Sequence, residues 1–373
     1  MVYDFAALPL ETLIGPVARA TETLARLDER LSRSPVREGW TERQNFADAV
    51  AALWLEGELV HIEDLVLHDA HMDIRTPTHE LTRAHAVLRV RRQIIARPAD
   101  WALGREGLRH LTCRGAAAPA ELDRDGQGSS GQQPYRGEEI EVDEPDPLTE
   151  EFAAIDAVLN RTTKVLEGGA VQVRPARASQ PDRPALVYDL DWDEDARLGE
   201  WQEVVTSTRD LPSVLRAAIL LEAWSTIEVL QHGAWLGPLL VASLLRREGI
   251  AAGHLASLHV GAKSIPRERR RARSSGERVL AFVEAIQETA LIGLREHDRL
   301  VMAKTQTERR LRDRRSNSKL PELVELVLSR PLVSTGMVED RLKVSKQGAL
   351  NLIGELGLRE MTGRGRFRAW GIT

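Results

Sequence analysis

The residues best suited to a defined chemistry lie near the C-terminal end of the chain, and that chemistry is hydrogen bonding to DNA. Lys346 offers donors that suit guanine, while Gln347 and Asn351 carry amides that can bond adenine bidentately. Their spacing places all three on the outward side of one helix. The predicted DNA-binding residues are Thr335, Ser345, Lys346, Gln347, Asn351, Arg364, Arg366 and Arg368.

Three predicted helices position these side chains. The first covers Leu320–Ser329 and stops at Pro331, and the second starts at residues 333–335. The third begins after Ser345, a good N-cap, and closes at Gly357. Its other face carries apolar residues at helical spacing, which predicts that this face is buried against the first two helices.

A basic hairpin is predicted to follow the third helix. Residues 358–362 and 366–372 resemble two short strands, and two glycines flank Arg364 in the turn between them. Arg364, Arg366 and Arg368 suit phosphates or a narrow minor groove. The order of three helices and a hairpin predicts a winged helix-turn-helix over residues 316–373.

The charge distribution supports this interpretation. Residues 309–373 contain fourteen basic and seven acidic residues and so carry a net charge of +7, whereas the rest of the chain carries −12. A basic module on an acidic body is typical of a domain that binds a polyanion. We therefore expect sequence-preferring binding to double-stranded DNA and a transcriptional regulator; a winged helix used only for protein contacts is the alternative.

The same stretch resembles a known family. The runs Leu332-Val-Ser-Thr, Val344-Ser-Lys-Gln-Gly-Ala-Leu and Leu356-Gly-Leu-Arg-Glu-Met-Thr-Gly-Arg-Gly-Arg-Phe-Arg-Ala-Trp are similar to an uncharacterised alphaproteobacterial family, often plasmid-associated. Trp54-Leu-Glu-Gly-Glu-Leu-Val and Arg75-Thr-Pro-Thr-His-Glu-Leu extend the resemblance over most of the chain. It implies a helical body, a C-terminal helix-turn-helix and DNA binding, with no established activity.

A weaker resemblance links residues 211–245 to Fic proteins, which transfer AMP. Their core is a helix, a loop of the form His-Pro-Phe-x-Asp/Glu-Gly-Asn-Gly-Arg and a second helix; here only His232 and Gly237 match that loop. Ala52 to Glu56-Gly57 is similar to the inhibitory helix of that family. The loop lacks the acidic metal ligand and the arginine that clamps phosphates, so the resemblance implies an inactive, Fic-like body without catalytic residues.

Other chemistry is not favoured. The second histidine of a zinc-protease motif starting at His79 would be residue 83, which is an arginine, and lone Cys113 excludes a disulfide and a thiolate zinc site. The acidic residues at 189–195 fit a solvated loop better than a cation cage. We expect no metal, no cofactor and no enzymatic activity, and interpret the first-domain histidines as surface or core residues: His61, His68, His71, His79 and His85.

The chain divides by composition into four parts, of which the winged helix-turn-helix at residues 316–373 is the last. Residues 1–113 form a helical region with helices at 10–31, 41–55 and from residue 78, where Thr41 is the expected N-cap of the second and Pro77 starts the third. Residues 114–147 form a disordered acidic linker. Residues 148–315 are a second helical domain, with helices at 211–231, 237–247 and 276–297 and two short strands at 170–174 and 185–189.

The apolar segments of the sequence indicate where the protein is located and how it assembles. No signal peptide and no apolar run long enough for a bilayer are present, so we expect a cytoplasmic protein with no membrane partner. We expect a homodimer paired through the apolar face of helix 276–297, although the same face could pack inside its own body. An AMP-transferase-like enzyme and a plasmid-maintenance or antitoxin-like protein remain the alternative functions. The residues of this face are Val279, Phe282, Val283, Ile286 and Ala290.

Overall fold

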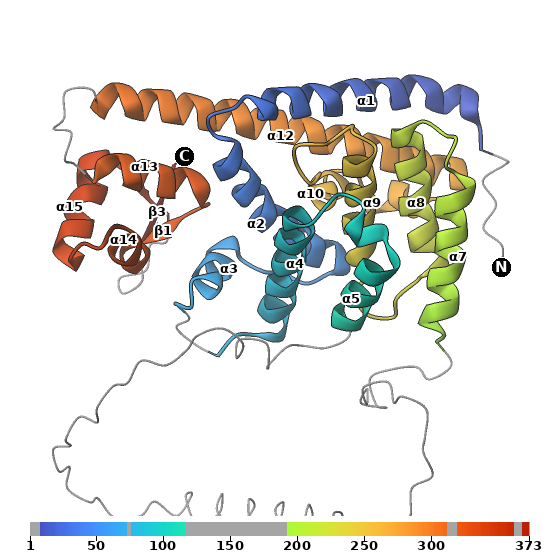
Figure 1. Cartoon of the computed structure of the whole chain (residues 1–373), viewed down its shortest axis with the longest axis horizontal. Coiled ribbons are helices and arrows are strands. Elements are labelled where there is room, and N and C mark those ends of the chain that lie inside the picture. Colours follow the sequence, from blue (N-terminus) through green and yellow to red (C-terminus); the bar gives the residue numbers. More distant parts are fainter. Residues whose placement is uncertain (1–7, 73–75, 116–191, 312–318, 362–367, 373) are drawn as a thin grey trace, which may run out of the picture. The chain divides into compact units, whose positions relative to one another are not determined.

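The computed structural model describes residues 8–72, 76–115, 192–311, 319–361 and 368–372, and it confirms a mainly helical chain (Figure 1). Residues 116–147 of the predicted linker, the strands at 170–174 and 185–189, and the side chain of Cys113 lie outside the described residues, whereas residues 114 and 115 are helical and not part of a linker. The body contains α1 Leu10–Ser32, α2 Arg37–Glu56, α3 Ile62–Asp69, α4 His79–Ala96, the 3-10 helix η1 Trp101–Leu103, α5 Arg105–Gly115, α7 Glu194–Ser207, α8 Ser213–Ile227, α9 Leu236–Arg247, α10 Leu258–Lys263, α11 Arg267–Arg270 and α12 Ser275–Leu311.

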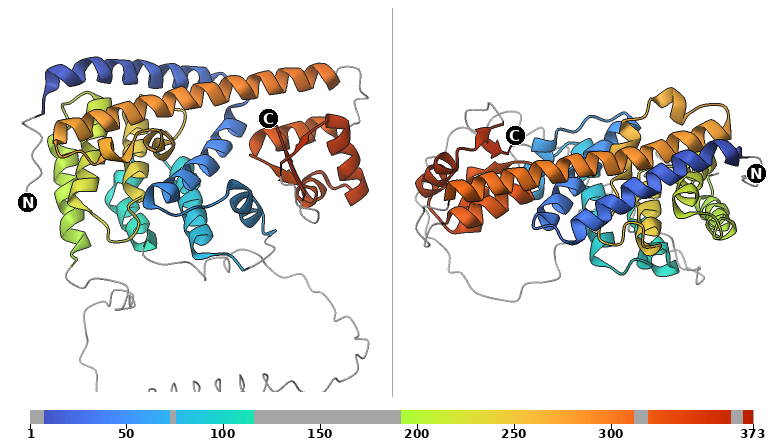
Figure 2. Two further views of the ribbon diagram at one scale, coloured as in Figure 1. Left: turned by 180° about the vertical axis from the view of Figure 1, so that it is seen from behind. Right: turned by 90° about the horizontal axis from the view of Figure 1, so that it is seen from above.

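The body is built around the long helix α12. α1 lies along it, as the views in Figure 2 show, and α8 and α10 pack against it as well. α2 packs between α4 and α10, and α8 packs against α7 and α9. Residues before position 116 and after position 191 share one hydrophobic core. Among the described residues, no helix combines the length and apolar character needed to cross a membrane.

The apolar face of α12 belongs to this core. The five residues of the predicted face, from Val279 to Ala290, are all buried within the chain. The helix itself continues to Leu311, well beyond the predicted end at residue 297. Trp40 donates its indole N–H to the carbonyl of Gly293, 2.9 Å away, and so joins α2 to the middle of α12. The prediction that this face forms a dimer interface is therefore wrong, because α1, α8 and α10 already cover it.

Helix ends differ from the predictions in three places. α2 begins at Arg37, four residues before Thr41, which lies inside the helix and caps nothing. α4 is capped by Thr78, whose hydroxyl accepts the Leu81 N–H, so Pro77 precedes the cap. α8 ends at Ile227, because Glu228 takes a left-handed conformation, while the end of α2 at Gly57 is confirmed by a φ of 93°.

A buried ionic network joins three helices of the body. The carboxylate of Asp48, on α2, accepts the backbone N–H groups of His259 and Val260 at the start of α10, at 3.0 and 3.2 Å. It also binds the His259 ring and the guanidinium of Arg91 on α4. Arg91 in turn donates to the carbonyl of Leu255 at 3.1 Å, so the segment leading into α10 is held from two sides.

Charge balance decides the ionisation of this network. Burial alone would raise the pKa of Asp48, but Arg91, His259 and the backbone N–H donors outweigh burial and hold the pKa below its usual value of 3.8. Asp48 and Arg91 are both fully buried. A buried pair of this kind contributes little net stability as a whole, but removing one partner leaves the other charge buried and unpaired.

We predict that Asp48→Asn lowers the free energy of unfolding by about 3–5 kcal/mol, measured by urea denaturation at pH 7. Asp298→Asn is the matched control, because its pair with Arg30 is exposed and should contribute less than about 1 kcal/mol. The stabilising effect of Asp48 is present above pH 3.8 and is lost as the pH falls through its lowered folded-state pKa, so the difference between wild type and variant should narrow below pH 3.8. Equal losses in the two variants at pH 7 would contradict this assignment.

Candidate nucleic-acid interface

The C-terminal domain has the predicted order of helices with one additional strand. It contains α13 Leu320–Ser329, β1 Val333–Ser334, α14 Thr335–Leu342, α15 Lys346–Leu356, β2 Arg359–Glu360 and β3 Ala369–Gly371 (Figure 1). The strands form an antiparallel sheet in the order β1-β3-β2, with Val333 opposite Trp370. Residues 333–335 are predicted to start a helix, but Val333 and Ser334 instead pair with β3 before α14 begins.

Local caps fix the angle between α14 and α15. The Ser334 hydroxyl accepts the Met337 N–H at the start of α14, and the Ser345 hydroxyl accepts the Gly348 N–H at the start of α15, each at 3.2 Å. Lys343 lies in the left-handed region and turns the chain between the two helices. Gly357 ends α15 with a φ of 68°, as predicted from its position.

The first two turns of α15 present the predicted base-reading side chains. Lys346, Gln347 and Asn351 are exposed, while Ala349 and Ile353 on the other side are buried against the domain core. The Gln347 amide donates to the Asn351 carbonyl oxygen at 3.1 Å, so the two side chains lie together on one face. Both amides are therefore available at the N-terminal end of the helix, which is the end that reaches base edges in helix-turn-helix proteins.

The other predicted DNA-binding residues have different positions. Thr335 is half-buried at the first position of α14, and Ser345 acts as the helix cap described above. Arg364 and Arg366 lie outside the described residues. Arg368 is exposed, pairs with Glu360 at 2.6 Å across the hairpin and lies over the Trp370 ring. DNA contact by each of these residues stays a prediction.

The domain is attached to the body at the C-terminal end of α13. Gly39 of α2 lies so close that a side-chain Cβ there would be 2.8 Å from the carbonyl oxygen of Leu328. Arg43, one turn further along α2, donates to the carbonyl oxygens of Leu328 and Val327 at 3.0 and 3.2 Å. Arg43 thus satisfies carbonyl groups that the last turn of α13 cannot bond internally.

Burial changes the pKa of the Arg43 guanidinium. Loss of water lowers the pKa of its guanidinium to about 10, although Glu296 on α12 opposes the shift and Arg299 adds to it. The guanidinium remains a cation at neutral pH. Its carbonyl contacts with α13 are therefore charge-assisted, which makes them stronger than neutral hydrogen bonds.

A second attachment is centred on Asp69 at the end of α3. Its carboxylate binds Arg330, which follows α13, at 3.0 Å, and also binds Arg92 of α4 and His85. Burial would raise the pKa of Asp69, but hydrogen bonds from His85, Arg92 and Arg330 hold it far below its usual range. Both arginines also lie near the face of Phe46. Asp69 therefore connects the domain to α4 through one buried carboxylate.

Helix α12 provides the third attachment. Arg299 donates to the carbonyl oxygen of Ile372 at 2.9 Å, and Lys304 pairs with Glu325 of α13 at 2.7 Å. No sequence pattern identifies Arg43, Asp69 or Arg299, because a charged residue on a helix that makes an interdomain contact has the same spacing as one that is solvated.

The histidines near this junction are not grouped as metal ligands. The rings of His68 and His85 meet edge to face, 4.7 Å between centroids, and His85 points to Asp69. Among the described residues, no three His, Cys, Asp or Glu side chains are grouped so that they could hold a metal ion. Two described residues of the acidic run accept backbone hydrogen bonds: Asp193 caps α7 by accepting the Ala196 N–H at 2.9 Å, and Glu194 accepts the Gln231 N–H at 3.2 Å.

The loop between α8 and α9 contains His232 and is held by α2 and α10. The Trp235 N–H donates to Glu56 at 3.1 Å, and the Trp235 carbonyl lies 3.1 Å from the His259 ring. Glu56 also binds Arg83. Trp224 is buried, as predicted, and its indole N–H donates to the carbonyl of Ala234 in the same loop.

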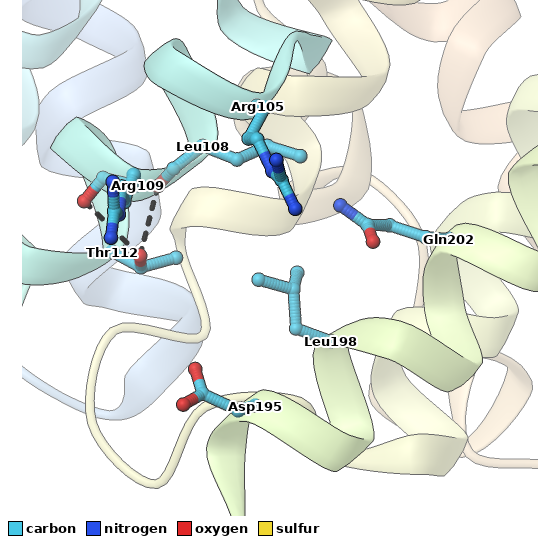
Figure 3. A pocket seen from close by; sticks show the side chains of 7 residues that line it. All are labelled: Arg105, Leu108, Arg109, Thr112, Asp195, Leu198 and Gln202. Atoms are coloured by element: carbon cyan, nitrogen blue, oxygen red, sulfur yellow. Dashed lines mark hydrogen bonds between the residues drawn. The ribbon is translucent and has the colours of Figure 1, made fainter.

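A polar cleft of about 570 Å³ lies between α5 and α7 (Figure 3). Arg105 and Gln202 extend into it from opposite sides, with Leu198 between them and Asp195 at the α7 end. Arg105 and Arg109 are exposed and lie one turn apart on α5, and the same spacing is found on any solvated face of a helix. The cleft therefore identifies no ligand.

The fold and the exposed face of α15 define a helical protein with a C-terminal helix-turn-helix DNA-binding domain. Residues 320–373 match the family described as HTH DNA binding domain, and residues 186–312 match a family described as a protein of unknown function, DUF1612. The chain is 50% identical over 392 aligned residues to the uncharacterized protein y4cF of Sinorhizobium fredii, with 100% of both chains covered. The chain belongs to the DUF1612 family that carries this C-terminal domain, which confirms the predicted family with a helical body and a helix-turn-helix.

A solved Fic family protein from Desulfovibrio desulfuricans is similar in structure, with 13% sequence identity and a TM-score of 0.46, over 100% of this chain and 98% of that chain.

We predict that Arg43→Met loosens the attachment of the C-terminal domain while both parts stay folded. Methionine keeps the apolar stem but removes the donors to the α13 carbonyls, and a charge-assisted hydrogen bond of this kind is worth about 1.5–3 kcal/mol. Hydrogen exchange at the α2–α13 contact should accelerate accordingly. Arg33→Gln, at an exposed position on the preceding turn, is the control and should change nothing. Unchanged exchange in Arg43→Met would show that the attachment does not depend on this residue.

Proposed function

We propose that the protein is a transcriptional regulator that binds double-stranded DNA with sequence preference. The observation that carries the proposal is the exposed pair Gln347 and Asn351 on the first two turns of α15, beside Lys346. Amides on the N-terminal part of a recognition helix can read adenine in the major groove. The match of residues 320–373 to a DNA-binding domain supports the same conclusion.

The attachment to the body supports a role beyond nonspecific binding. Three sets of ionic and carbonyl contacts, at Arg43, Asp69 and Arg299, hold the domain against α2, α3 and α12. None of these contacts uses the exposed face of α15. The body can therefore set the orientation of the reading helix without covering it, which is the arrangement that a regulator with a fixed operator geometry requires.

We predict that selection from random duplex oligonucleotides gives one preferred sequence, and that Gln347→Ala weakens binding to it by about 1–3 kcal/mol while relaxing the base preference. Arg366→Ala, at the tip of the predicted wing, should weaken binding to all sequences alike because it addresses phosphates. Fluorescence anisotropy at several salt concentrations provides the measurement, with affinity falling steeply as salt rises. A uniform loss in both variants, or no loss when residues 319–373 are removed, would falsify the proposed groove contact.

We further propose that the regulator binds as a homodimer. One winged helix buries only about 600–1,000 Å² of protein surface on DNA, and a pair of them reads two half-sites. The interface has to lie outside the buried face of α12. Light scattering of the DNA complex should give twice the 41.6 kDa chain mass, with footprints that show a repeated half-site; a single chain on an unrepeated site would rule out the dimer.

We also propose that the α8–α9 loop has no AMP-transfer activity. Glu56 accepts the Trp235 N–H at the start of α9, and a helix N-terminus of this kind is where a nucleotide phosphate would otherwise bind. The loop also lacks an arginine that could clamp phosphates.

Incubation with labelled ATP and Mg²⁺ should therefore leave both the protein and added lysate proteins unlabelled. The variant Glu56→Gly is a more stringent test, because it removes the carboxylate from the start of α9. It should also be inactive, since the loop still lacks an arginine that could clamp phosphates. Labelling by either protein that disappears in the His232→Ala background would show that the loop is catalytic.

A further inference from the structure

A cavity of about 360 Å³ lies in the body between the end of α8, the following loop and the start of α12. Trp192, Trp224 and Phe282 form much of its wall, together with aliphatic residues of α8 and the loop. Polar groups contribute nearly as much of its lining as apolar ones, and a cavity of this size with aromatic walls and a few polar groups can hold a small organic molecule. Neither the DNA-reading face of α15 nor the contacts that attach its domain include any of these residues.

Trp224, one part of this aromatic wall, is held in place by its neighbours. Trp224 donates its indole N–H to the Ala234 carbonyl at 3.1 Å, and its ring meets that of Trp201 edge to face. Gly237 lies directly against the Trp224 ring, where any side chain would overlap it. A ligand therefore meets a wall that is already in place, which reduces the ordering that binding would require.

One unpaired cation lies at this cavity. Arg271 lines it and is exposed, and no carboxylate lies within ion-pair distance of its guanidinium among the described residues. Trp192 contributes its ring to the wall, whereas its indole N–H is buried with almost no accessible surface and so does not face the cavity. Arg271 is therefore the group that can bind an anion here.

The electrostatic environment at the Arg271 end is positive. Burial lowers the pKa of neighbouring Arg270, and the charges of Arg271 and Arg267 lower it further, so these cations are close enough to repel one another. Arg197 lies 3.9 Å above the Trp192 ring. An anion at this end would relieve the repulsion between the arginines.

Backbone strain is located at the same cavity. Glu228, which lines it, has φ 51° and ψ 60° although it is not a glycine. Strained residues of this kind are concentrated at functional sites, where the surrounding structure maintains them. The carboxylate of Glu228 would repel a ligand with two or more negative charges, so the net charge of the ligand is limited to about −1.

We infer that this cavity binds a small aromatic monocarboxylate. The aromatic ring packs against Trp192, Trp224 and Phe282, and the carboxylate accepts charge-assisted hydrogen bonds from the Arg271 guanidinium. The inference is independent of the proposed DNA binding, since the cavity and α15 have no residue in common.

The test uses 2-naphthoate with the full-length protein, followed by isothermal titration calorimetry and tryptophan fluorescence. At ordinary ligand efficiency for a molecule of this size, one site per chain with a Kd of about 0.1 mM is expected. Arg271→Gln should weaken binding about tenfold, the amount that loss of one charge-assisted hydrogen bond produces. Arg273→Gln removes the same charge two residues away, at a position that does not line the cavity, and should leave the affinity unchanged.

The neutral analogue 2-naphthamide separates the carboxylate from the ring. It should bind more weakly than 2-naphthoate and be insensitive to Arg271→Gln. Ala234→Phe places a ring in the cavity from its exposed rim and should abolish binding of both compounds. No saturable binding of 2-naphthoate up to about 2 mM, or equal affinities in wild type, Arg271→Gln and Ala234→Phe, would overturn the inference.

Discussion

The carboxylate of Asp48 is the interaction on which the arrangement of the body depends. It is fully buried, and it accepts hydrogen bonds from two backbone N–H groups of α10, from the His259 ring and from Arg91. A buried anion is tolerated only when charges and donors surround it, so α4 and α10 have to approach α2 at this level of the body. The His259 ring also lies 3.1 Å from the Trp235 carbonyl, so the same network contacts the α8–α9 loop.

Helix α2 connects this buried network to two other parts of the molecule, the α8–α9 loop and the C-terminal domain. Toward its C-terminal end, Glu56 accepts the Trp235 N–H and fixes the start of α9. Toward its N-terminal end, Gly39 and Arg43 meet the last turn of α13, where the DNA-binding domain is attached. One helix therefore contacts the loop that holds His232 and the domain that presents α15. The position of the reading helix depends on the same packing that fixes the body.

Local signals in the sequence predicted the C-terminal domain well and the body only in part. Ser345 and Gly357 act through bonds within a few residues, so they identify the ends of α15 without knowledge of the tertiary structure. Strand β1 was missed because its two residues form a strand only through pairing with β3, far along the chain. The apolar face of α12 was predictable, but whether a second chain or the same chain covers it depends on long-range packing. Arg43 and Asp69 were missed for the same reason, since their partners in the C-terminal domain lie more than two hundred residues away along the chain.

We propose that the N-terminal turns of α15 lie in the major groove, positioned by a body that does not itself contact the bases. Photocross-linking of bromodeoxyuridine-substituted DNA to the full-length protein, with the adducts located by peptide mass spectrometry, tests this directly. We predict adducts on the peptide that contains Lys346, Gln347 and Asn351, with any others on the 358–372 hairpin. Adducts confined to the arginine-rich segment at 263–278 of the body, with none on α15, would contradict it.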